Sequence, residues 1–93
     1  AVRSVKAGKL ISFDHSPDSL ADGARTLSVS ERTLFYLKQL DEFLEVTEQE
    51  IAENTRALND LFGTDIEPTS ALPFAGALRW LDRQDSPRKL VVI

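Results

Sequence analysis

A run of apolar and small polar residues, spaced alternately three and four positions apart, constrains this chain more than any other feature. The run comprises Leu37, Leu40, Leu44, Thr47, Ile51, Asn54, Leu58 and Leu61. Such spacing places every member on one stripe of an α-helix, as in a coiled coil. We therefore predict one long amphipathic helix over about residues 29–62, with this stripe, termed the seam, along one side.

Residues that favour helix caps stand at both ends of this predicted helix. Ser28 and Glu31 have the spacing of a capping box, and Gly63 stands where a C-terminal cap belongs. A helix of that length is roughly 50 Å long, whereas a compact chain of 93 residues has a radius of gyration of only about 12 Å. We therefore expect another chain to cover the seam in a coiled coil or helical bundle. Packing of the seam within its own chain is the alternative.

A second, shorter helix is predicted over about residues 71–84. Ser70 is a plausible N-cap, and Pro73 is tolerated in a first turn. Four apolar side chains fall on one face of this helix at helical spacing: Phe74, Ala77, Leu78 and Leu81. Trp80 is expected to anchor an interface. The predicted flanking interface comprises Tyr36, Phe43, Phe74, Leu78, Trp80 and Leu81.

Both ends of the chain have the character of short extended or β arms. Residues 1–13 suggest a hairpin around Gly8, and the aliphatic run Leu90–Ile93 favours a strand. These arms could pair within the chain or between chains. Between the first arm and the long helix, residues 14–28 form a connector in which Ser16-Pro17 suggests the start of a helical turn.

The predicted fold class is therefore mainly α, with extended arms at both termini. We expect one small domain of residues 1–93, divided into an N-terminal arm (1–13), a connector (14–28), the long helix (29–62), and the second helix with a strand-like arm (64–93).

A strip of six carboxylates without an intervening base lies within the predicted long helix. We term it the acidic strip, and it consists of Asp41, Glu42, Glu45, Glu48, Glu50 and Glu53. It could dock a basic partner surface, including the basic ends Arg3–Lys9 and Arg79–Lys89 of a neighbouring copy, or it could be a solvated outer face.

The sequence offers little that predicts catalysis. Cysteine is absent, which excludes thiol chemistry and disulfides. His15 lies directly beside Asp14, and adjacent residues cannot form a catalytic relay. The aspartates at 14, 18 and 22 lack the spacing of a calcium loop. We therefore expect no enzyme, and no catalytic residue, metal, cofactor or small-molecule substrate.

These features together predict a non-catalytic interaction subunit that oligomerises or docks in a larger assembly through the seam, as adaptors and virion or phage assembly proteins do. The alternative is a regulatory adaptor that binds a basic protein through the acidic strip. The net charge of −4 argues against direct binding to nucleic acid. No signal peptide or membrane-spanning stretch is expected, so the predicted location is the cytoplasm or a host-cell interior.

Overall fold

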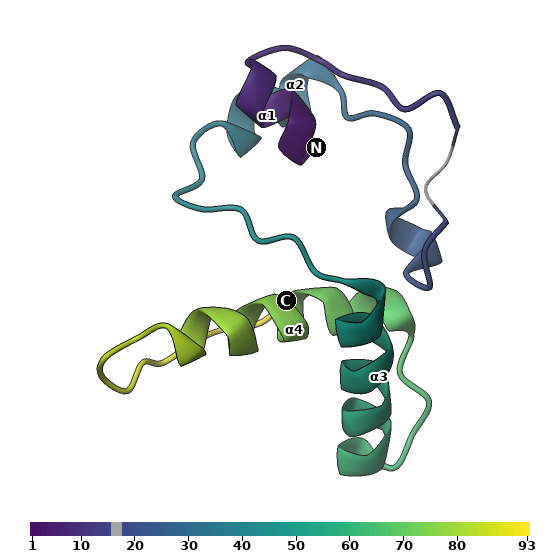
Figure 1. Cartoon of the computed structure of the whole chain (residues 1–93), viewed down its shortest axis with the longest axis vertical. Coiled ribbons are helices and arrows are strands. Elements are labelled where there is room, and N and C mark those ends of the chain that lie inside the picture. Colours follow the sequence, from purple (N-terminus) through teal and green to yellow (C-terminus); the bar gives the residue numbers. More distant parts are fainter. Residues whose placement is uncertain (16–17) are drawn as a thin grey trace. The chain divides into compact units, whose positions relative to one another are not determined.

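The computed structural model describes residues 1–15 and 18–93, and it confirms a mainly helical chain (Figure 1). The chain divides into two compact units. Unit 1 comprises Ala1–Asp18 and Arg25–Leu44, and unit 2 comprises Ser19–Ala24 and Glu45–Ile93. The elements are α1 (Val2–Ala7), the 3-10 turn η1 (Asp22–Ala24), α2 (Glu31–Leu37), α3 (Glu48–Phe62) and α4 (Pro68–Asp82).

The core of unit 2 lies where α3 packs against α4. Ile51 and Leu58 of α3 are buried, and they are seven residues apart, so they lie on one face of that helix. Ala71 and Ala75 of α4 are buried as well, at a spacing of four. Since alanine side chains are short, they allow the two helices to approach closely at this face.

The ends of α3 and α4 follow from local chemistry. Gly63 ends α3 in the left-handed conformation, with φ +65°, and its N–H donates to the carbonyl of Asn59. The predicted C-terminal cap is therefore confirmed. Helix α4 corresponds to the predicted second helix but begins three residues earlier, because Pro68 fits the first turn, where no N–H is needed. Pro73 lies inside the helix instead of at its start.

The predicted continuous helix over residues 29–62 is wrong. Helix α2 ends at Leu37, α3 begins at Glu48, and residues 41–47 between them have no helical structure. The N-cap of α2 is Ser30, whose hydroxyl accepts from the N–H of Thr33, and not the predicted Ser28.

Charge repulsion and capping together favour a break at this point, although the segment contains no glycine or proline. In one continuous helix the acidic strip would place like charges three and four residues apart, where they repel. In the observed fold Glu48 and Glu50 occupy the first turn of α3, where the helix dipole favours negative charge. The capping of this turn by Thr47 further favours a helix start at this point.

Unit 1 is built around contacts of α1 with α2 and with the segment after α1. Ser4 of α1 is buried, and its hydroxyl accepts from the N–H of Ile11 at 2.9 Å and donates to the Ile11 carbonyl at 3.3 Å. Leu34 of α2 is buried too. The Lys38 ammonium donates to the carbonyl of Gly8 at 3.0 Å, which ties the end of α2 to the end of α1.

The predicted β arms are also wrong, since residues 1–15 and 18–93 contain no strand. The first arm instead forms α1, because Gly8 adopts the left-handed conformation (φ +71°) that ends a helix and not a hairpin. Leu10–Phe13 and Leu90–Ile93 are outside regular structure. The predicted connector contains η1, and the turn start at Ser16-Pro17 lies outside the described residues.

Within the described ranges, no helix combines the length and apolar character that crossing a bilayer requires.

Candidate functional site

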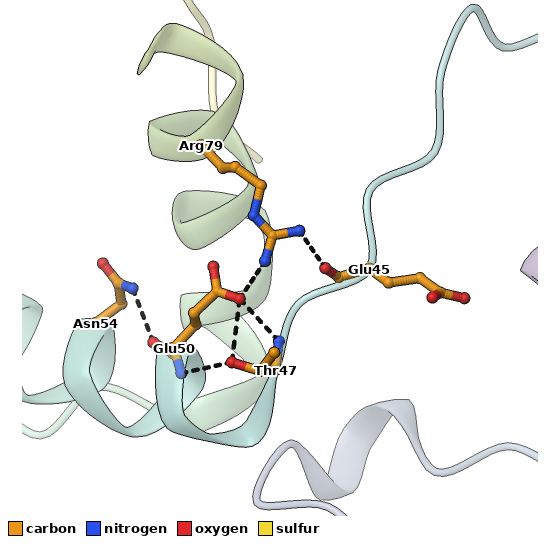
Figure 2. Close-up of polar contacts among 5 residues, drawn as sticks. All are labelled: Glu45, Thr47, Glu50, Asn54 and Arg79. Carbon is orange, nitrogen blue, oxygen red and sulfur yellow. Dashed lines mark hydrogen bonds and ion pairs between the residues drawn. The ribbon is translucent and has the colours of Figure 1, made fainter. Parts of the chain in front are cut away.

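A polar cluster at the start of α3 connects this helix to α4 and to the segment before it (Figure 2). Thr47 is the N-cap of α3, and its hydroxyl accepts from the N–H of Glu50 at 3.2 Å. In return the Glu50 carboxylate accepts from the N–H of Thr47 at 3.1 Å. The cluster is thus a capping box, which satisfies two N–H groups that a helix start leaves open.

Arg79 of α4 joins this cluster to the preceding segment. Its guanidinium forms an ion pair with the Glu50 carboxylate and donates a second hydrogen bond to the backbone carbonyl of Glu45, as Figure 2 shows. The hydrogen bond from the Thr47 N–H holds the pKa of the Glu50 carboxyl below its ordinary value. The Thr47 hydroxyl and the Arg79 charge add to this lowering of the pKa, against an opposing effect of burial. Glu50 is therefore held as a carboxylate that locks α3 to α4.

A second polar junction lies where η1 contacts the first turn of α4. The N–H of Gly23 donates to Thr69 Oγ1 at 3.1 Å. A Cβ atom added at Gly23 would lie 2.9 Å from this oxygen and 3.5 Å from Glu67 Oε1, so only glycine fits here without movement. Glu67 is the N-cap residue of α4, but its side chain makes no capping hydrogen bond. The junction thus presents a carboxylate and a hydroxyl beside exposed backbone.

Unit 1 contains a pocket of about 420 Å³ between the end of α1 and α2. It is lined by Gly8, Lys9, Leu10, Glu31, Leu34, Phe35 and Lys38. The Lys38 ammonium within it is already bound to the carbonyl of Gly8. A smaller hollow of about 340 Å³ includes His15 and Asp14 beside Arg3, which stacks over the Phe13 ring at 5.3 Å.

The predicted seam does not form a continuous stripe. Three of its members belong to unit 1 and five to unit 2, and Thr47 is a helix cap and not a core position. Ile51 and Leu58 are buried within the chain, whereas Leu40 and Leu61 are exposed. Asn54, predicted as a polar core residue, donates to the backbone carbonyl of Glu50 at 2.8 Å. A role of these residues between chains stays a prediction.

The flanking residues are likewise spread over both units. On α2, Tyr36 is exposed and meets the Phe35 ring edge-on, with centroids 5.3 Å apart. On α4, Leu78 is exposed, whereas Phe74 and Trp80 are half-buried. Phe43, before α3, and Leu81, near the end of α4, are also half-buried. An interface function for this set is untested.

The acidic strip is divided between an irregular segment and α3. Three of its carboxylates already accept hydrogen bonds within unit 2: Glu48 from the Leu20 N–H at 2.8 Å, Glu50 from Arg79, and Glu53 from the Gln49 amide at 2.9 Å. Asp41, Glu42 and Glu45 lie before the helix and are exposed. Docking of a partner protein by the strip stays a prediction.

Sequence reasoning missed both polar junctions. The signal for the capping box was present, because Thr47 and Glu50 have the required spacing directly before the buried Ile51. No comparable signal marked Gly23, because its close approach to α4 joins residues 46 positions apart. Among the described residues, no group of three or more His, Asp or Glu side chains could hold a metal ion.

Comparisons with known proteins point to enzymes. The chain is 32% identical over 77 residues to L-threo-3-hydroxyaspartate ammonia-lyase of Saccharomyces cerevisiae, a match that covers 82% of this chain and 23% of the relative. It is 39% identical to the T.th. threonine deaminase, whose crystal structure it matches with a TM-score of 0.79 over 87% of this chain and 29% of that one. No family model matches. The chain thus spans about a quarter of the length of these two relatives.

These similarities correct the functional expectations. A non-catalytic assembly subunit, of the adaptor, virion or phage type, is wrong, and so is the alternative of a regulatory adaptor, because both relatives are enzymes. The expectation that no small-molecule substrate is involved is wrong as well, because both relatives are named for reactions of an amino acid. The seam is divided between α2, α3 and the segment that joins them, so its spacing does not require a partner chain.

Proposed function

We propose that this chain is part of an enzyme that releases ammonia from a hydroxy amino acid. The observation that carries the proposal is the agreement of two comparisons, by sequence and by structure, on one type of reaction. Threonine and 3-hydroxyaspartate both carry a hydroxyl group on the carbon next to the amino-bearing carbon. The substrate class proposed for the enzyme is therefore a small β-hydroxy amino acid.

The junction of Gly23, Glu67 and Thr69 is the proposed contribution of this chain to substrate binding. A hydroxy amino acid carries an ammonium, a carboxylate and a hydroxyl group, each of which needs a polar partner in a binding site. The Glu67 carboxylate is not used to cap α4, and it lies in the same turn as the Thr69 hydroxyl. The glycine permits the backbone of η1 to approach both side chains.

The proposal is tested by transplanting the chain. The segment of the T.th. threonine deaminase that matches this chain is replaced by residues 1–93, and the purified chimaera is assayed for ammonia release. We expect ammonia from threonine, from L-threo-3-hydroxyaspartate, or from both. A chimaera that is folded by circular dichroism and releases ammonia from neither would overturn the proposal.

The role of the junction is tested in the same chimaera with a matched pair of variants. Glu67→Gln removes the charge from the junction, and we expect kcat/KM to fall about 10-fold or more, as for a lost hydrogen bond to a charged group. Asp65→Asn removes a nearby exposed charge and should leave kcat/KM unchanged. Equal effects of the two variants would refute the junction's role without touching the ammonia-release proposal.

Two further expectations from the sequence belong to this proposal. The first is that residues 1–93 form one domain, which a single cooperative unfolding transition would support. The second is a location in the cytoplasm or a host-cell interior, which cell fractionation would test.

A further inference from the structure

The short turn η1 brings Gly23 into the junction with α4. This turn spans only Asp22–Ala24, and the N–H of Ala24 donates to the carbonyl of Ala21 at 2.9 Å. A 3-10 turn has poorer hydrogen-bond geometry than an α-helix, so a short one is held weakly by its own backbone. The position of η1 therefore depends on contacts with other elements.

Contacts with both helices of unit 2 hold this turn and the residues just before it. On one side, the N–H of Gly23 donates to Thr69 Oγ1 of α4 at 3.1 Å. Ala21 is 1% exposed, so this part of the segment is buried. On the other side, the N–H of Leu20 donates to Glu48 Oε2, in the first turn of α3, at 2.8 Å. The start of α3 thus holds the segment from one end while α4 holds it from the other.

We propose that Glu48 is a positioning residue of the junction, whose carboxylate holds the N–H of Leu20 and thereby keeps Gly23 against α4. This inference rests on the proposed function, in which the junction binds substrate. Glu48 belongs to α3, whereas the side chains of the junction belong to α4, so it acts through η1. When the hydrogen bond to Leu20 is lost, η1 is free to move away from Thr69, and the close approach of the Gly23 backbone is lost with it.

Stabilisation of α3 by its dipole is the alternative role of Glu48. A carboxylate in a first turn is favoured by the helix dipole whatever it contacts. The dipole requires a negative charge, whereas the positioning role requires an oxygen atom within reach of Leu20. Glu48→Asp keeps the charge but shortens the side chain by one carbon, about 1.5 Å, which takes the carboxylate out of hydrogen-bond range. Glu48→Gln keeps the length and an acceptor oxygen but removes the charge.

Amide hydrogen exchange of Gly23, measured by NMR in the 93-residue chain, distinguishes the two roles. We expect exchange at Gly23 to be about 5-fold faster or more in Glu48→Asp, because local opening exposes this amide. In Glu48→Gln it should stay within about 2-fold of the wild type, because an acceptor remains. An acceleration by Glu48→Asp no larger than that by Glu48→Gln would overturn the proposal.

A control variant shows whether the effect is specific to Glu48. Glu53→Asp shortens another exposed carboxylate of α3, which accepts from the Gln49 amide and does not contact η1. Exchange at Gly23 should be unchanged in this variant. An acceleration equal to that in Glu48→Asp would attribute the effect to α3 as a whole and would overturn the proposal.

The effect on the junction is measured in the threonine deaminase chimaera. We expect Glu48→Asp to lower kcat/KM about 3-fold or more, a modest loss because the hydrogen bond lies at the surface, and Glu48→Gln to retain at least about half. Thr69→Val removes the hydroxyl that accepts from Gly23. In that background Glu48→Asp should cost little further activity, because coupled residues are not additive. Losses that simply multiply would overturn the proposal.

The exchange measurement requires no activity, so the two proposals can fail separately. A folded chimaera that releases no ammonia would overturn the proposed function, while exchange at Gly23 would still decide whether Glu48 holds η1. A chimaera that releases ammonia, with equal kcat/KM in Glu48→Asp and Glu48→Gln, would overturn the positioning role and support the proposed function.

Discussion

Alanine substitutions at Ile51 and Leu61 separate a core inside the chain from a seam between chains. Both residues belong to α3 and to the seam, and each loses three carbon atoms on substitution. Ile51 is 1% exposed, whereas Leu61 is 71% exposed. At about 0.8 kcal/mol for each buried carbon, Ile51→Ala loses about 2.4 kcal/mol of transfer free energy. The cavity left between α3 and α4 raises this loss to about 3–4 kcal/mol.

The expected cost of Leu61→Ala is much smaller. Less than a third of that side chain is buried, so the loss of stability should stay below about 1 kcal/mol. Urea unfolding of the 93-residue chain, followed by the helical circular dichroism signal, measures both losses. Equal and large losses of unfolding free energy at the two positions, growing with protein concentration, would refute this reasoning. They would indicate that the seam packs between chains.

Three further predictions concern single residues. Glu50→Gln should destabilise the chain at neutral pH, and the difference from the wild type should shrink as the pH falls through the lowered pKa of Glu50, below about 4.5, in unfolding experiments across that range. The reason is that the ion pair with Arg79 requires the charged carboxylate, and the hydrogen bonds from Thr47 are stronger to the charged form than to the neutral one. Gly76→Ala should raise the free energy of unfolding by about 0.5–1 kcal/mol, because an added Cβ meets nothing within 4 Å and alanine favours the helix. Gly63→Ala should instead lower it by about 1 kcal/mol, because the residue has φ +65°, and thermal unfolding of both variants checks the opposite signs.

The limit of the sequence is clearest at the break between α2 and α3. The alternating spacing of three and four residues continues without interruption from Leu37 to Leu61. Periodicity alone therefore cannot distinguish one continuous helix from two helices whose apolar residues follow the same spacing. The decisive information was local and chemical, namely the Thr47 and Glu50 capping box. A capped helix start is more stable than a continuous helix only if the residues before the cap can pack outside the helix. Whether they can do so depends on the packing of the whole unit.

The candidate site was less accessible to sequence reasoning than the helices. Gly23 and Thr69 are far apart in sequence, and neither belongs to a motif that marks chemistry. Arg79 was predicted to meet the acidic strip of a neighbouring copy, yet it meets Glu50 of its own chain. Tertiary packing decides which residues that are remote in sequence come close together in space. The local patterns of a single sequence do not contain this information.

The sequence by itself determined that the chain is mainly helical, that α3 ends at Gly63, and that a second helix follows, because helix periodicity and glycine caps depend on neighbours within a turn or two. Only the tertiary structure decided that the long helix divides, that the N-terminal arm is helical, and that Ile51 lies in a core whereas Leu61 does not. Burial is the physical reason, because a side chain leaves water only where another element comes to cover it.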